Sequence, residues 1–297
     1  LLSSWFNPGF LKMHRVDWKS PAEVLEKLIQ HEAVHAIDGW DDLRRRLQPD
    51  RRCFAFFHPQ LPSEPLIFVE VALLPEIPTV ITPLVDKKAE TVDQPSQYKV
   101  AVFYSISNCE PGLRGVSMGN FLIKRVAEQL HAEFPGLKTF VTLSPIPGFM
   151  DWVSAGANLG EDVPVERLKP SLRAARDQAL ATLKLDAQSW TEKLSAGWHP
   201  DLASPKEQEA LMSLASIYLG LGSTGRNGNP VAKFHLGNGA KLHLVNWAGD
   251  LSRKGLRQSA GLMVNYLYDL GNVEENHEKF ANGEIVYSRA VGKLMAH

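Results

Sequence analysis

The chain has 297 residues, of which 44% are hydrophobic and 22% are charged, and its formal net charge is -1. This composition is typical of a soluble globular protein and allows one large domain or two of ordinary size. Because the charges nearly cancel, no overall electrostatic field would attract nucleic acid or an anionic membrane. We therefore expect neither as a partner, and an anionic ligand must be held by local groups.

Two cysteines, Cys53 and Cys109, lie in unrelated sequence contexts. They suggest no disulfide framework and no zinc site, which favours a reducing compartment. No apolar run reaches the roughly 18 residues that a membrane helix needs, and the first residues do not resemble a secretory signal. Since the chain does not begin with methionine, we expect it to lack an upstream region. Its last residues are not the peroxisomal Ser-Lys-Leu signal, which favours a bacterial cytoplasm, with the mitochondrial matrix as the alternative.

The first half of the chain predicts strands interrupted by helices. A helix is expected at residues 20–29, where Ser20 is a suitable cap and Pro21 a suitable first residue. A short helix is expected at 41–47, and a strong helix from about 118 to 134 has apolar side chains at helical spacing. Apolar runs typical of strands occupy residues 53–57, 66–74, 99–107 and 139–143.

The second half predicts more helix before further strands. From about 150 to 222 the pattern is helical. Residues 231–236 and 241–247 are predicted to form a hairpin, because they flank an Asn-Gly pair, which is a strong turn signal. The run 262–268 suits a strand or a helix, and the tail after Asn272 is predicted to be helical. This order predicts an α/β (α+β) fold, with a mixed central sheet, a central crossover helix and a helical insertion.

A glycine-bearing turn, residues 111–120, precedes the strong helix. Glycine lets a backbone approach a ligand closely, and the first turn of a helix offers unpaired N–H groups to a diphosphate. Arg114 adds a positive charge. The turn lacks the Gly-Lys-Ser/Thr ending and the G-x-G-x-x-G spacing of nucleotide-binding loops, so a plain connecting turn is the alternative. It resembles the pyrophosphate loop of acetyl-CoA-dependent N-acetyltransferases, with Ser117 where that loop usually has glycine.

Several longer segments resemble malonyl-CoA decarboxylases, which are similar to those acetyltransferases in fold. Two segments are long enough to be highly specific: residues 143–149, Leu-Ser-Pro-Ile-Pro-Gly-Phe, and residues 229–240, Asn-Pro-Val-Ala-Lys-Phe-His-Leu-Gly-Asn-Gly-Ala. Shorter matches lie at residues 32–35, 103–107, 119–126, 246–247 and 265–268. The resemblance runs from the first residues to about Tyr268.

The resemblance implies an acetyltransferase-like catalytic domain over residues 1–297 that converts malonyl-CoA to acetyl-CoA and carbon dioxide. It also implies a homo-oligomer, formed through a helical domain upstream of this chain. By resemblance Ser144 and His235 are the catalytic pair, which also contacts malonyl-CoA, and Tyr268 lies near them. The malonyl-CoA loop falls on Arg114, Gly115, Val116, Ser117, Met118, Gly119 and Asn120. Some members have a functionally important glutamate at the position of Ser117, so the role of that acid does not carry over.

The chemistry accounts for these residue types. Loss of carbon dioxide leaves two electrons in the thioester carbonyl, so the enolate needs a hydrogen-bond donor and a proton donor, but no metal or organic cofactor. His235, on the predicted strand 231–236, has an ordinary pKa of about 6.5 that suits proton transfer near neutral pH. Ser144 precedes a proline, which favours an extended backbone. Because a hydroxyl is a poor base unaided, we expect Ser144 to orient the malonyl group or relay a proton. Tyr268 is a further donor or a core aromatic.

Structural roles stay open for the other candidates. Lys27 matches a lysine that matters in some members, yet a lysine on a helix surface is commonly just solvated. His35 belongs to a matching segment and has no derivable role beyond a structural hydrogen bond. A group of arginines either meets the 3′-phosphate of the coenzyme or forms an ordinary charged face: Arg44, Arg45, Arg46, Arg51 and Arg52.

Two other functions stay open. An N-acetyltransferase would use the same coenzyme site, but it needs an amine channel and a base for the amine, and no sequence feature identifies either. A malonyl-CoA sensor would bind its ligand without turnover. The presence of both Ser144 and His235 argues against a sensor, which has no need of a proton donor.

Overall fold

A computed structural model of the chain describes residues 8–86, 88, 94–113, 122–159, 163, 169–184, 186–225 and 227–296. The chain divides into two compact units, an N-terminal unit of Leu1–Thr142 and a C-terminal unit of Leu143–His297. Each unit has its own strands and its own buried side chains.

The N-terminal unit is built on five strands that lie in sequence order. They are β1 (Lys12–Val16), β2 (Arg51–Phe57), β3 (Pro65–Leu74), β4 (Val100–Asn108) and β5 (Thr139–Thr142). The first four pair antiparallel, whereas β4 and β5 pair parallel and are joined through α5 (Leu122–Glu133). The expected mixed strand pairing and the central crossover helix are therefore confirmed. The other helices are η1 (Pro8–Phe10), α2 (Ala22–His31), α3 (Gly39–Arg46), α4 (Thr82–Val85), η2 (Pro95–Gln97) and η3 (Pro111–Leu113).

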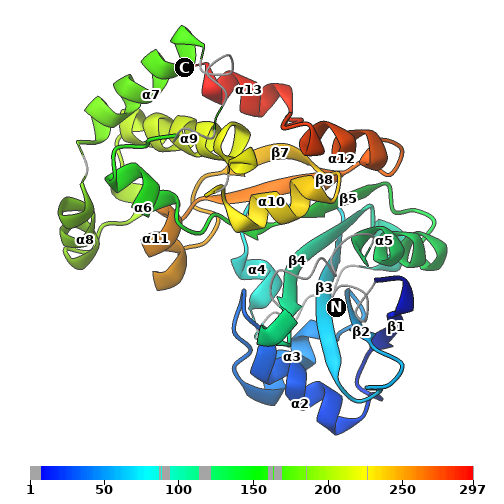
Figure 1. The fold of residues 1–297 in the computed structure, drawn as a ribbon. Helices are drawn as coiled ribbons and strands as arrows, with labels where there is room; N and C mark the ends of the chain where they lie inside the picture. The colour runs from blue at the N-terminus through cyan, green and yellow to red at the C-terminus, as the bar shows by residue number, and fades with distance from the viewer. Residues whose placement is uncertain are drawn as a thin grey trace. The chain divides into compact units, whose positions relative to one another are not determined.

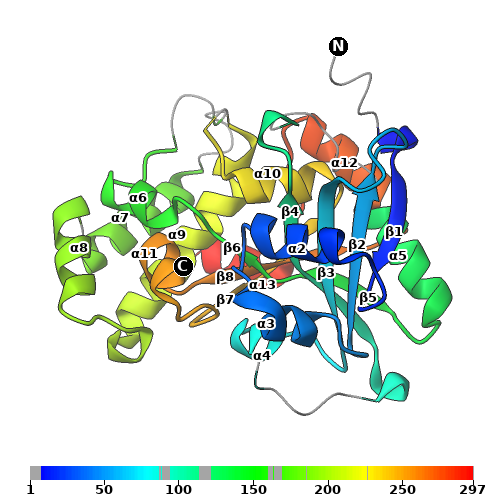
Figure 2. The same cartoon turned by 90° about the horizontal axis from the view of Figure 1, so that it is seen from below.

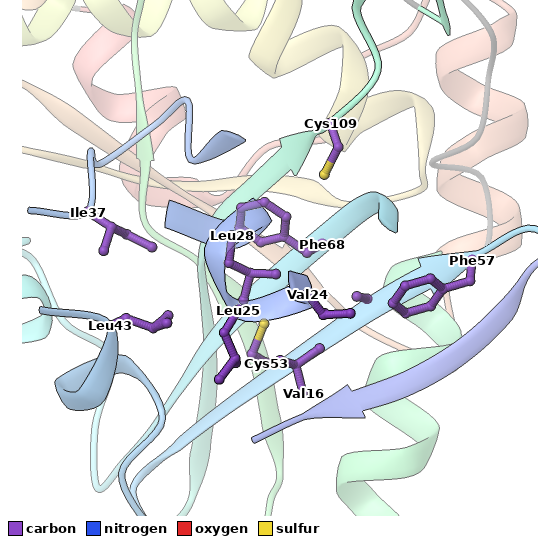
Figure 3. Close-up of a cluster of buried hydrophobic side chains, with 11 residues drawn as sticks. Val16, Val24, Leu25, Leu28, Ile37, Leu43, Cys53, Phe57, Phe68 and Cys109 are labelled. Carbon is purple, nitrogen blue, oxygen red and sulfur yellow. The ribbon is translucent and has the colours of Figure 1, made fainter. Parts of the chain in front are cut away.

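Side chains of β2 alternate between its two faces, and each face packs against a different helix. Cys53, Ala55 and Phe57 point toward one face and form a buried cluster with α2, which Figure 3 shows. On the opposite face, Arg125 of α5 lies over the ring of Phe56, 5.5 Å from its centre. β2 is buried along its whole length, and after Arg51 and Arg52 its sequence is apolar. Figure 2 shows α2 and α5 on either side of these strands.

The C-terminal unit begins with a largely helical stretch. After the short strand β6 (Ser144–Pro145), this stretch contains α6 (Phe149–Ser154), α7 (Pro170–Leu183), α8 (Ala187–Ser195), η5 (Pro200–Leu202), α9 (Pro205–Gly220) and η6 (Gly222–Thr224). Ser204 caps α9 and shares a capping box with Glu207. Most of α9 is buried, which fits its position against α7 and α13 (Figure 1).

The strand β8 (Met263–Tyr268) organises the rest of this unit. It pairs antiparallel with β6 on one edge and with β7 (Lys241–Asn246) on the other. The run 262–268, which suited a strand or a helix, is thus a strand. The remaining helices are α10 (Pro230–Gly237), α11 (Arg253–Ser259), α12 (Val273–Ala281) and α13 (Arg289–Met295).

The predicted hairpin at residues 231–247 is wrong, because its first half is the helix α10. The Asn-Gly pair that suggested a tight turn instead ends this helix: Asn238 is its C-cap, and Gly239 follows with a φ of +81°. A side chain at Gly239 would place its Cβ against the carbonyl of Val273. Glycine is therefore required here for leaving a helix and for close packing, not for a hairpin.

Candidate active site

Ser144 occupies the strand β6 and is almost fully buried. It lies opposite Val264 of β8, and residues that are paired across strands point to the same side of a sheet. The chain beyond Ser144 contains two prolines and then Gly148, whose φ of +75° starts α6. Fixed proline dihedrals and strand pairing together hold Ser144 in one orientation.

His235 lies on the helix α10 rather than on a strand. Asn229 caps this helix, its Oδ1 accepting from the N–H groups of Val231 and Ala232 at 3.0 Å and 2.9 Å, and Pro230 is the first helical residue. This combination of cap and proline is a strong signal for a helix start, and it outweighs the apparent alternation along 231–236. With Ala232 and Leu236, His235 forms the buried face of the helix.

Tyr268 and Tyr266 are both buried on β8. Successive side chains of a strand alternate between its two sides, so the two tyrosines share the side of Val264 and hence of Ser144. One face of the C-terminal sheet therefore presents a serine hydroxyl and two phenol rings to the helix that carries His235.

The side chains of Ser144, His235 and Tyr268 form a continuous hydrogen-bonded chain. Ser144 Oγ lies 3.3 Å from His235 Nε2, and Tyr268 Oη lies 2.8 Å from His235 Nδ1. A neutral imidazole carries one proton, so it donates to one of these hydroxyls and accepts from the other. Such an arrangement can pass a proton between two oxygen atoms or hold a hydroxyl as a hydrogen-bond donor to a ligand.

Aromatic rings surround the imidazole. The Tyr266 ring is stacked on it at 4.8 Å between centroids with 25° between the planes, and the Phe234 ring meets it edge-on at 5.1 Å. Burial lowers the pKa of His235 from its ordinary value to about 3, and it raises the pKa of Tyr268 well above its ordinary value. Near neutral pH His235 is thus an uncharged relay between two neutral hydroxyls, whereas an exposed imidazole would titrate near pH 6.5.

The lowered pKa of His235 predicts a specific loss of stability in acid. The unfolded state binds a proton on this imidazole below about pH 6.5, whereas the folded state does not bind one until about pH 3. The contribution of the neutral His235 imidazole to the free energy of unfolding is therefore fully present above pH 6.5 and is lost as the pH falls toward 3. From this group alone, we expect the free energy of unfolding to drop by about 1.5 kcal/mol between pH 6.5 and pH 5.

Urea unfolding at a series of pH values checks this prediction by comparison with His235→Gln, which has no titrating group there. As the pH falls, the wild type should lose free energy of unfolding relative to His235→Gln. His243 also has a pKa lowered by burial, but it is present in both proteins and cancels. Parallel curves for the two proteins from pH 7 to pH 5 would show that the imidazole of His235 is protonated freely in the folded state.

The expected malonyl-CoA loop lies outside the described residues, and this applies to Arg114, Gly115, Val116, Ser117, Met118, Gly119 and Asn120. Its role stays a prediction. In the N-terminal unit Lys27 forms ion pairs with Glu64 at 2.5 Å and Glu23 at 3.5 Å. The backbone N–H of His35 donates to Glu32 Oε1 at 2.9 Å.

Internal ion pairs engage most of the arginines that were candidates for a phosphate site. Four of the five are buried beside carboxylates of the N-terminal unit: Arg45 and Arg51 with Asp50, Arg46 with Asp42 and Glu70, and Arg52 with Glu133. The guanidinium of the fifth, Arg44, lies 4.9 Å from the ring centre of Trp18. These contacts support a structural role for the four buried arginines.

Neither a metal cluster nor a membrane helix is found in the described part of the chain. No three His, Cys, Asp or Glu side chains gather there in a way that could hold a metal ion. None of the described helices is both long enough and apolar enough to cross a membrane.

Two residues at the site, Tyr266 and Asn229, were not predicted from the sequence. Tyr266 is two residues before Tyr268, so a strand over 263–268 would have placed both on one side. Asn229 was part of a matching segment, and its position before a proline was the signal for a helix cap. Both residues were missed because the secondary structure around them was open or wrongly predicted.

Comparisons with known proteins identify the family of the chain. The family model of the malonyl-CoA decarboxylase C-terminal domain matches residues 9–297. The mitochondrial malonyl-CoA decarboxylase of Anser anser anser is 43% identical over 291 residues, which covers 93% of this chain and 56% of that protein. The corresponding protein of Rattus norvegicus is 41% identical and is covered to 57%. The chain thus spans little more than half the length of these curated relatives.

Solved structures show the same likeness. A malonyl-CoA decarboxylase from Rhodopseudomonas palustris is 46% identical with a TM-score of 0.80, over 98% of this chain and 68% of that one. One from Agrobacterium vitis is 47% identical with a TM-score of 0.78, over 99% of this chain and 69% of that one. The resemblance first noted in the motifs is therefore confirmed along nearly the whole chain. The chain belongs to the malonyl-CoA decarboxylase C-terminal domain family.

Proposed function

We propose that this chain catalyses the decarboxylation of malonyl-CoA to acetyl-CoA and carbon dioxide. The observation that carries the proposal is the hydrogen-bonded chain of Ser144, His235 and Tyr268, buried within the C-terminal unit. The names of the relatives supply the substrate, since they are called malonyl-CoA decarboxylases. A proton relay of this kind is suited to a reaction that creates a carbanion and then protonates it.

The electron flow of the reaction explains which groups are needed. The bond between the α-carbon and the carboxylate breaks, carbon dioxide leaves, and the electron pair moves into the thioester carbonyl to form an enolate. A C–H bond then forms at the α-carbon, and the proton comes ultimately from solvent. Because the thioester itself accepts the electrons, the proposed step requires neither a metal nor an organic cofactor.

Each side chain of the relay has a defined task in this proposal. The hydroxyl of Ser144 orients the malonyl group and donates a hydrogen bond or a proton toward the enolate. His235 exchanges a proton with Ser144 through Nε2, and Tyr268 holds the other ring nitrogen. One well-placed donor to a developing oxyanion accelerates a reaction by roughly 10²–10³. A neutral relay suits this task because it adds no buried charge before the enolate appears.

The coenzyme is proposed to bind through its diphosphate at residues 114–120. In this proposal, the glycines let the backbone approach the phosphates, and the start of the following helix and Arg114 supply positive charge. Assembly into a homo-oligomer and a cytoplasmic location remain proposals as well. Curated relatives carry names that place them in mitochondria.

Product analysis in D₂O tests the proposed function. Purified chain is incubated with malonyl-CoA, and acetyl-CoA is identified by mass spectrometry. The enolate route predicts acetyl-CoA with one more solvent-derived deuterium in its methyl group than the malonyl methylene carried. A no-enzyme sample is the control for spontaneous decarboxylation.

The same assay separates the alternatives. An N-acetyltransferase would leave malonyl-CoA unchanged and would release free coenzyme A from acetyl-CoA when amines are added. A sensor would bind malonyl-CoA and return it intact after long incubation. Either result would contradict the proposed decarboxylase.

A further inference from the structure

Asn229 connects the helix that carries His235 to the segment that carries Ser144. Its side chain is fully buried. While Oδ1 caps α10 through Val231 and Ala232, Nδ2 donates to the carbonyl oxygen of Pro147 at 2.8 Å. One amide group therefore binds two segments that are far apart in the sequence, and these are the segments of the two most specific motifs.

A third element meets the same amide. A hydrogen bond from Asn229 acts on the hydroxyl of Tyr218 in α9, where it opposes the rise in the pKa of this tyrosine that burial causes. The ring of Tyr218 packs beside Trp152 at 4.9 Å and Phe149 at 5.9 Å, and both belong to α6. Oδ1 of Asn229 accepts twice and Nδ2 donates to Pro147, and these three bonds fix the orientation of the amide.

The connections from this amide to the reactive atoms are short and stiff. Pro147 is three residues after Ser144 in a segment held by two prolines and by pairing with β8. His235 lies within the short helix that Asn229 caps. If α10 shifted along its axis or rotated around it, the 3.3 Å distance between Ser144 Oγ and His235 Nε2 would change by a similar amount.

We propose that Asn229 is a positioning residue that sets the separation of Ser144 and His235 and thereby the rate of proton transfer between them. This inference rests on the proposed function and adds a residue to it. Capping alone does not require asparagine, since serine and aspartate cap helices equally well. Aspartate has no donor hydrogen, and the hydroxyl of serine ends one bond short of the position of Nδ2, so the amide is the group that caps α10 and also reaches Pro147 as a donor. The donor is therefore the part of Asn229 that serves positioning.

Two variants separate the donor from the cap. Asn229→Ser and Asn229→Asp both keep an oxygen that accepts from the N–H groups of α10. Aspartate has no hydrogen to donate to Pro147, and the shorter serine side chain does not reach the position from which Nδ2 donates. We expect kcat per folded protein to fall about tenfold to a hundredfold in both, because small misplacements of reacting groups have effects of this size. KM should change less than about threefold, since the coenzyme contacts are untouched. Two variants are used so that misfolding of one leaves the other informative.

Ser288→Ala is the matched control. Ser288 caps α13, accepts from the N–H of Val291 at 3.2 Å and donates to the carbonyl oxygen of His243 at 2.6 Å. It therefore has the same double role as Asn229, in the same unit, but its bonds reach neither Ser144 nor His235. The control variant should lose thermal stability and keep the kcat of the wild type.

A double-mutant cycle with Ser144→Ala gives the sharpest result. If Asn229 acts by positioning Ser144 against His235, then Asn229→Ser should lower kcat by less than about threefold when Ser144 is already absent. A purely structural role predicts that the two losses multiply. Multiplying losses, or an unchanged kcat in both Asn229 variants, would overturn the inference.

The ¹⁵N signals of the His235 ring test the positioning role of Asn229 without any measurement of activity. In protein labelled with ¹⁵N-histidine, the signals of His235 are assigned by their absence from His235→Gln. Asn229→Ser should shift the ring nitrogen signals of His235 in the same direction as Ser144→Ala does, because both weaken the bond to Nε2. This result would support positioning even if the wild-type protein failed to decarboxylate malonyl-CoA. Unshifted signals in Asn229→Ser would contradict positioning, whatever the activity.

Discussion

The variant His235→Gln is expected to lose between about 10² and 10⁴ in kcat, which is the usual contribution of a positioned proton-transfer group. Glutamine keeps a neutral polar side chain, and its amide can still hydrogen-bond to one of the hydroxyls around His235. It cannot accept a proton on one atom and release it from another, so the relay between Ser144 and Tyr268 is broken. Steady-state rates of acetyl-CoA formation from malonyl-CoA measure the loss.

His243→Gln is the control for this substitution. His243 is a half-buried histidine of β7 in the same unit, and it makes no hydrogen bond to Ser144 or Tyr268 among those described. Its variant should retain the kcat of the wild type. Ser144→Ala is expected to lose at least about tenfold, and the double variant should be hardly worse than His235→Gln, because groups that act as a unit are not additive. If His235→Gln turned over within threefold of the wild type, the imidazole would have no part in the chemistry.

The second large effect is expected on stability, from Arg46→Met in the N-terminal unit. The guanidinium of Arg46 is almost fully buried, and it donates to Asp42 Oδ1 at 3.1 Å, Glu70 Oε2 at 3.0 Å and the carbonyl oxygen of Ala36 at 3.3 Å. Burial raises the pKa of Glu70, and the charge and hydrogen bond of Arg46 act against this rise and favour the ionised carboxylate. Methionine fills similar space but leaves both carboxyl groups without their cation. We expect the free energy of unfolding to fall by about 3–5 kcal/mol, as for other buried pairs that lose one partner.

Urea unfolding followed by circular dichroism checks this value. Arg15→Met is the matched control, since Arg15 pairs with Glu133 at 3.3 Å in the same unit but is half exposed. An exposed pair of this kind contributes about 0–1 kcal/mol. Adding Glu70→Gln to Arg46→Met should restore part of the lost stability, because it removes one of the uncompensated carboxyl groups. A loss no larger than that of the Arg15 control would show that the buried guanidinium of Arg46 does not stabilise the N-terminal unit.

Sequence patterns were sufficient for most strands of the N-terminal unit because burial on both faces gives those strands apolar runs of several residues. The runs around Phe56 and Phe68 are examples. The strand β1 was not predicted, since only Val16 of its five residues is buried, Met13 is half-buried, and the other three are charged or polar and exposed. Hydrophobic periodicity reports burial, so it does not detect a strand that is mostly exposed.

The helix α10 was mispredicted for a different reason. Over six residues an alternating pattern and a helical pattern differ at few positions, and the Asn-Gly pair after Leu236 favoured a hairpin. The helix start at Asn229 and Pro230 was the stronger physical signal, because it satisfies N–H groups that a strand would pair elsewhere.

The candidate site shows what motifs can and cannot provide. The choice of Ser144, His235 and Tyr268 came from the resemblance, and the structure brings these three together. Their distances, the stacked ring of Tyr266 and the lowered pKa of His235 depend on how β8 and α10 pack, which no local pattern contains. For the loop at 114–120, the prediction still awaits a test.

Both cysteines of the chain, Cys53 and Cys109, lie in the N-terminal unit, and burial raises the pKa of both thiols, that of Cys109 to about 12. The thiolate is the form that attacks an alkylating reagent, so neither sulfur should be modified while this unit stays closed. The rate of alkylation, followed by mass spectrometry, therefore measures how often the N-terminal unit opens. It would time the unfolding of the N-terminal unit without any engineered label, because the C-terminal unit has no thiol to contribute.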